Sequence, residues 1–168
     1  MAEQSTRSTN GIFISYVHED HDIAAGIGDL LRSEGCKNVF FTGDEWLLYA
    51  GEVWLERIRE ELTSAKVVLC LFSPCAMGRQ WVHFEAGAAW LTNKALIPVC
   101  IRGLTVEDLR IPYAGIQGVT LVDHSSAYYL VRSICKYLPL KPFPIPPPFP
   151  SDNPAWLRLQ LALSCERA

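Results

Sequence analysis

Val67-Val68-Leu69-Cys70-Leu71-Phe72 is an uninterrupted apolar run, and Ser73-Pro74 ends it. A strand that is apolar at every position is expected where both faces of a sheet are covered, as they are in parallel sheets. Four further short runs are rich in β-branched and aromatic residues and are typical of strands, at 11–16, 39–41, 95–101 and 119–122. The sequence therefore predicts five strands.

Segments with helical periodicity separate these strands. Helices are predicted at 20–34, 53–62, 79–93 and 125–138, with a short turn of helix near 105–109. Strands that alternate with helices indicate a parallel sheet with helices on both faces. Right-handed crossovers then favour an α/β, flavodoxin-like, doubly wound five-stranded sheet in the order 2-1-3-4-5. Pro98 cannot donate to a ladder, which predicts a bulge or an unpaired side in the fourth strand.

Ligands of doubly wound folds bind outside the carboxyl ends of the strands, near the switch point between strands 1 and 3. The segments expected to converge there are Ser15, Tyr16, His18, the loop 42–50, Ser73 and the start of the helix that carries Glu85.

Composition limits the function classes. The 168 residues allow one ordinary domain with short extensions, and the net charge of −3 argues against a nucleic-acid partner. No run approaches the roughly 18 apolar residues of a membrane span, and residues 1–10 lack the apolar core of a secretory signal. The six scattered cysteines form neither a zinc pattern nor a disulfide framework. We expect a cytoplasmic protein with no metal and no membrane partner.

Four parts can be distinguished along the chain. They are a leader expected to be disordered at 1–10, a domain at 11–138, a proline-rich strap or linker at 139–150, and a short apolar tail at 151–168. In the tail, Pro154 after capping residues favours a helix, whereas alternating leucines are also compatible with a strand. The sequence leaves both interpretations open, and the tail is expected to pack on this domain or on another subunit.

Glu85 occupies an unusual position. On a helix it shares a face with Trp81, Val82, Ala88 and Ala89, all of which are apolar. A carboxylate directed into such a stripe costs free energy unless it is paired or used. It is therefore either a structural acid bonded to a buried arginine or backbone amide, or a catalytic group. Trp81 correspondingly either walls a site or packs in the core.

Several catalytic motifs are absent from the sequence. There is no Gly-x-Gly-x-x-Gly after the first strand, and no Walker loop, His-Glu-x-x-His or Gly-x-Ser-x-Gly occurs. The four histidines do not form a metal spacing. These absences leave Glu85 as the main candidate for chemistry.

Four segments together resemble a Toll/interleukin receptor (TIR) domain over roughly residues 11–138. They are Ile12-Phe13-Ile14-Ser15-Tyr16, the loop from Gly43 to Gly51, Leu71-Phe72-Ser73-Pro74, and Trp81-Val82-His83-Phe84-Glu85. The chain is most similar to the prokaryotic-like, NAD-cleaving branch of that family. The resemblance implies cleavage of the nicotinamide–ribose bond of NAD+ with Glu85 as the catalytic residue, releasing nicotinamide and ADP-ribose or a cyclic isomer in an immune or defence response.

The resemblance also implies binding residues and partners. NAD+ is a substrate, and no cofactor is implied; the residues expected to bind it are Trp81, Ser15, Tyr16, His18, Asp44, Trp46 and Ser73. Val17 and His18 stand where some relatives carry basic residues, which weakens the case for a phosphate contact there. The BB-like loop 42–51 is expected to gate the pocket or to mediate TIR–TIR self-association, and an upstream sensor or downstream effector protein is a further candidate partner.

Two other functions remain open from the sequence. The chain is compatible with a non-catalytic TIR adaptor that acts by homotypic assembly, although animal adaptors of this family generally lack the helix glutamate. A nucleoside deoxyribosyltransferase-like enzyme shares the flavodoxin-like layout and a catalytic glutamate, but no further motif supports it. Hydrolysis and cyclisation of NAD+ are not distinguished.

Overall fold

The predicted sheet is confirmed. The computed structural model describes residues 11–42, 54–138 and 150–165, and within them five parallel strands pair in the order β2-β1-β3-β4-β5. The strands are β1 (Gly11–Ser15), β2 (Val39–Phe41), β3 (Ala65–Phe72), β4 (Ala95–Cys100) and β5 (Val119–Thr120).

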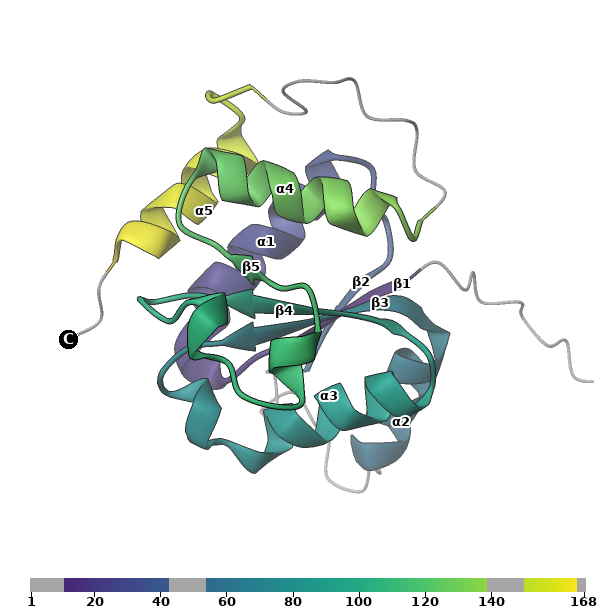
Figure 1. Ribbon diagram of the computed structural model, residues 1–168. Coiled ribbons are helices and arrows are strands. Elements are labelled where there is room, and N and C mark those ends of the chain that lie inside the picture. Colours follow the sequence, from purple (N-terminus) through teal and green to yellow (C-terminus); the bar gives the residue numbers. More distant parts are fainter. Residues whose placement is uncertain (1–10, 43–53, 139–149, 166–168) are drawn as a thin grey trace, which may run out of the picture.

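Helices cover both faces of the sheet, as Figure 1 shows, with α1, α4 and α5 on one face and α2 and α3 on the other. Their bounds are α1 (His21–Ser33), α2 (Trp54–Ser64), α3 (Gln80–Leu91), α4 (His124–Cys135) and α5 (Pro154–Ser164). Short 3-10 turns are η1 (His18–Asp20), η3 (Ala76–Gly78), η4 (Val106–Asp108) and η5 (Tyr113–Gly115). The chain thus forms three layers.

The alternation of side chains along the strands divides the core into two clusters. Ile12 and Ile14 of β1 pack in the cluster with α1, whereas Phe13 packs in the cluster with α3. Residues 67–72 of β3 are completely buried, which confirms that both faces of this strand are covered. The central strand therefore holds the two layers of helices together.

Pro98 is accommodated by an unpaired side. It pairs in register with Cys70 of β3, and the ladder between β4 and β5 begins only at Val99. Ile101 N donates to Phe72 O at 2.9 Å, so odd-numbered amides in this segment face β3. The nitrogen of Pro98 consequently faces the other side, before β5 begins.

The C-terminal tail forms a helix, α5. Asn153 caps it by accepting hydrogen bonds from Ala155 N at 2.8 Å and Trp156 N at 3.3 Å, and Pro154 occupies the first turn. The helix packs on α1 and α4, where the ring of Trp156 lies edge-on to that of His124 at 5.2 Å. Because the tail packs on its own domain as a helix, the helical interpretation of residues in this segment holds and the strand interpretation does not.

Several expectations concern residues outside the described ones. These are the leader 1–10, the segment 43–53 with Asp44 and Trp46, and most of the proline-rich segment, 139–149. In the part of the chain that is described, no helix combines the length and the apolar character needed to cross a bilayer.

Candidate active site

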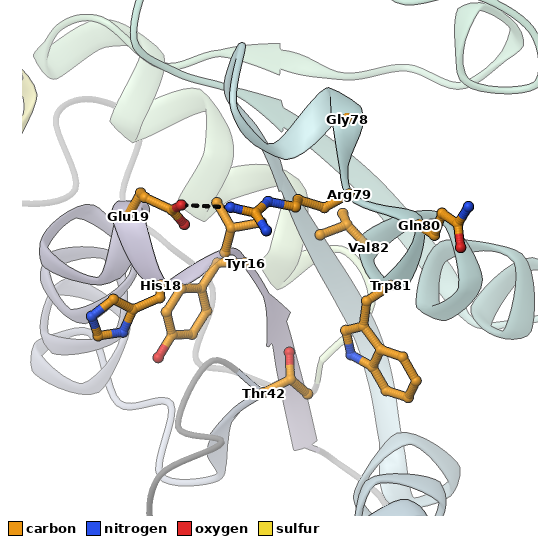
Figure 2. Close-up of a pocket in the computed structure, with 10 residues that line it drawn as sticks. Tyr16, His18, Glu19, Thr42, Gly78, Arg79, Gln80, Trp81 and Val82 are labelled. Carbon is orange, nitrogen blue, oxygen red and sulfur yellow. Dashed lines mark hydrogen bonds and ion pairs between the residues drawn. The ribbon is translucent and has the colours of Figure 1, made fainter.

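A cavity of about 500 Å³ opens at the carboxyl edge of the sheet, where the sequence placed the ligand site. It lies between the segment that follows β1 and the start of α3 (Figure 2). The residues that line it are Tyr16, Val17, His18, Glu19, Thr42, Gly78, Arg79, Gln80, Trp81 and Val82. A volume of this size suits a small organic ligand.

Glu85 lies directly behind the wall of this cavity. Its side chain is completely buried, and each of its oxygens accepts a hydrogen bond from a cavity residue. Trp81 Nε1 donates to Oε1 at 2.7 Å, and Thr42 Oγ1 donates to Oε2 at 3.2 Å. The position in α3 that the sequence singled out therefore holds a buried carboxylate, separated from the cavity by two donors.

The field of this carboxylate reaches the neighbouring strand. Burial raises the pKa of the Cys70 thiol, and the charge of Glu85 raises it further. Ser15 is paired in register with Cys70, is completely buried, and does not line the cavity. Its Oγ makes no hydrogen bond with oxygen or nitrogen atoms among the described residues, so the weak Cys70 sulfur is its polar neighbour.

Tyr16 and His18 do reach the cavity. The Tyr16 ring is buried edge-on against Phe41 at 6.2 Å, and its hydroxyl lies 3.0 Å from Nδ1 of His21. His18 is exposed at the start of η1. Figure 2 shows Tyr16 and Trp81 on opposite sides of Thr42. Three of the predicted binding residues, Tyr16, His18 and Trp81, are thus brought together.

Ser73 lies elsewhere. Its hydroxyl donates to Asp20 Oδ2 at 2.6 Å and accepts from Ala76 N at 3.1 Å, and the residue does not line the cavity. These bonds give Ser73 a structural part at the end of β3. A role in binding a substrate stays a prediction.

Glu19 is a cavity residue that the sequence did not indicate, whereas Thr42 and Arg79 lie in segments expected there, the loop 42–50 and the start of the helix that carries Glu85, but were not singled out. Thr42 directly follows β2, at the carboxyl edge of the sheet. Arg79 and Glu19 form an ion pair at 2.8 Å across the cavity, with 58% and 45% of their side chains exposed. A backbone hydrogen bond, with smaller contributions from Cys75 and Arg79, lowers the pKa of Glu19. The cavity therefore carries a cation and an anion on facing walls.

His83 fixes the start of α3. Its Nε2 lies 3.0 Å from Met77 O and its Nδ1 lies 2.8 Å from the Tyr113 hydroxyl. Because a carbonyl can only accept, Nε2 carries a proton, and in the neutral ring Nδ1 accepts from the tyrosine. Burial raises the pKa of Tyr113 to about 12, so this donor stays protonated at neutral pH. The pair holds the turn before Trp81 against the core.

Among the described residues, no group of three or more histidine, cysteine, aspartate and glutamate side chains is arranged to hold a metal ion.

No curated protein matches the chain. A family comparison matches residues 12–131, most of the chain, to the TIR domain. The chain therefore belongs to the TIR domain family.

Proposed function

We propose that this TIR domain cleaves NAD+ at the nicotinamide–ribose bond, with Glu85 as the catalytic carboxylate. TIR domains act in signalling and immune responses, and they generally self-associate through TIR–TIR contacts. One observation carries the proposal: a completely buried carboxylate that accepts hydrogen bonds from Trp81 and Thr42, both of which line a cavity of about 500 Å³.

The chemistry requires little more than such a carboxylate. In NAD+ the nicotinamide is already cationic and leaves as a neutral molecule, so no general acid has to protonate it. The reaction needs a negative charge that stabilises an oxocarbenium-like ribose and holds the sugar in place. Glu85 is completely buried and is held by Trp81 and Thr42, so it can provide that charge once these two donors give way to the sugar.

The arrangement around Glu85 also suggests how ribose is recognised. Two donors, an indole N–H and a hydroxyl, presently occupy the two carboxylate oxygens. The 2′- and 3′-hydroxyls of ribose form a similar pair of donors and would replace Trp81 and Thr42 as they turn aside. The exchange leaves no buried carboxylate oxygen without a donor, which keeps its free-energy cost low.

Arg79 supplies a cation for the diphosphate. It lies at the rim of the cavity and pairs with Glu19, and both side chains are more than a third exposed. Exposed ion pairs contribute only about 0–1 kcal/mol, so a diphosphate can take the place of Glu19 at little cost. This compensates for the lack of a basic residue at Val17 and His18.

The test is release of nicotinamide from NAD+ by the purified protein at high concentration or with a crowding agent, followed by chromatography. Glu85→Gln keeps the shape and removes the charge, so we expect activity to fall by two or more orders of magnitude, typical of a lost electrostatic stabiliser. Glu107→Gln, an exposed carboxylate in η4, is the matched control and should retain activity. Equal activity of wild type and Glu85→Gln would remove Glu85 from the mechanism.

A second candidate is a non-catalytic role in TIR–TIR assembly, favoured by the outer face of α3. Phe84, Trp90 and Leu91 of this helix are 61%, 66% and 75% exposed. Large apolar side chains grouped on one exposed surface are typical of interaction sites. Failure to release nicotinamide under any assembly condition, together with concentration-dependent self-association, would favour this role. In the enzymatic case, the product peak distinguishes linear from cyclic ADP-ribose.

A further inference from the structure

Helix α5 lies beyond the segment matched to the TIR family and is docked on the domain. Leu159 is completely buried and Trp156 is 3% exposed. A Cβ built on Gly26 of α1 would lie 3.0 Å from Leu159 Cα, so the backbones of the two helices are in close contact. An apolar helix packed this closely against α1 is part of the hydrophobic core of the domain.

Arg102 joins the end of α5 to the start of α1. It follows β4 with a left-handed φ of 53°, and its guanidinium has acceptors on two separate segments. Nε donates to Asp20 Oδ1 at 2.7 Å, Nη2 donates to Asp22 Oδ1 at 2.8 Å, and Nη1 donates to Cys165 O at 3.0 Å. Only the planar fork of arginine reaches three such acceptors at once.

The same guanidinium holds η1, which forms one wall of the cavity. Asp20 is the last residue of η1, is completely buried, and also accepts from Ser73 Oγ. Arg102 Nη2 makes a further bond to Glu19 O at 3.2 Å. Burial opposes the charge of Arg102, but its bonds to Asp20 and Asp22 raise its pKa. The positions of His18 and Glu19 in the cavity wall therefore depend on Arg102.

We propose that Arg102 is a positioning residue through which the docking of α5 sets the position of η1. The consequence for NAD+ affinity rests on the proposed function, whereas the mechanical coupling of α5 to η1 does not. A protein that binds or displaces α5 would then change substrate binding without touching Glu85. Helix α5 is in this sense a control element for the cavity.

Hydrogen–deuterium exchange tests the coupling in the full chain. Leu159→Ala loosens α5 from α1, and Leu161→Ala, at a site 71% exposed on the same helix, is its matched control. We expect Leu159→Ala to speed exchange of the amides of 17–22 at least tenfold, and Leu161→Ala to leave it within twofold. Faster exchange in α5 with no change at 17–22 would overturn the proposal.

Kinetics on NAD+ separate positioning from general destabilisation. Arg102→Gln removes the fork, and Arg102→Lys removes it while keeping a charge beside Asp20, so that at least one variant should fold. We expect both to raise KM at least fivefold with kcat within threefold of wild type. Arg158→Gln, which breaks only the exposed pair with Asp29, should change neither constant.

The two proposals fail in different ways. A fall in kcat at unchanged KM in both Arg102 variants would overturn the positioning role. If the wild type releases no nicotinamide, the proposed function fails, while the exchange rates at 17–22 still decide whether α5 and η1 are coupled.

Discussion

The hydrogen bond from Trp81 Nε1 to Glu85 Oε1 can be measured by a double-mutant cycle. At 2.7 Å it joins a donor to a completely buried carboxylate. Trp81→Phe keeps an aromatic ring and removes the donor, so we expect the free energy of unfolding to fall by ~1.5–3 kcal/mol, the range for hydrogen bonds to charged groups. For a chain of this length that corresponds to a decrease in Tm of roughly 3–12 °C.

The same substitution should cost less once the charge is gone. In the Glu85→Gln background the acceptor is a neutral amide, and Trp81→Phe should then cost only ~0.5–1.5 kcal/mol. The difference, a coupling free energy of ~1–1.5 kcal/mol, reports the negative charge on Glu85. Urea unfolding of the wild type, both single variants and the double variant gives this quantity directly.

Trp90→Phe is the control, because Trp90 lies on the same helix and is 66% exposed. Its effect should add to that of Glu85→Gln within ~0.5 kcal/mol. A coupling between Trp81 and Glu85 below that level would refute the reasoning, since the carboxylate would then not be a charged acceptor held by the indole.

Two glycines and one helix cap give further predictions. Gly26→Ala places a Cβ 3.0 Å from Leu159 Cα and should destabilise the protein by ~1–3 kcal/mol, whereas Gly87→Ala, inside α3 with no atom within 4 Å, should stabilise it by ~0.4–1 kcal/mol. Urea unfolding checks both, and changes of equal sign would contradict the packing argument. Asp123→Ala removes the cap of α4 and should cost ~1 kcal/mol at pH 7. Hydrogen bonds from Ser126 lower the pKa of Asp123, so its contribution is present above the unfolded-state value of about 3.9 and is lost as pH falls through the lower folded value. Thermal unfolding of wild type and variant should therefore converge near pH ~2, and a constant difference would argue against the cap.

The features that could be predicted from the sequence are those set by residues close to one another along the chain. The apolar run 67–72 required a strand covered on both faces, and the alternation around it gave the sheet order. The apolar neighbours of Glu85 within one helix predicted its burial. Each of these inferences depends on residues within about one turn or one strand of each other, where local geometry is fixed by backbone periodicity.

Contacts between distant segments could not be predicted in this way. Asp20 and Arg102 are 82 residues apart, and nothing local in either segment indicates that they pair. Ser73 was expected at the cavity from its place after β3, but a serine hydroxyl bonds whichever acceptor packing brings near, which here is Asp20. Thr42 likewise became a partner of Glu85 only through the pairing of β2 with β1.

Two exposed thiols neighbour the contacts of η1 from other elements: Cys75 precedes η3 and lies next to the side chain of Glu19, and Cys165 follows α5 and is bonded through its carbonyl to Arg102. Spin labels or fluorophores attached to these two native cysteines would report the distance between Cys75 and Cys165. The width of that distance distribution would measure how far the wall of the cavity formed by η1 moves, with no cysteine added to the sequence.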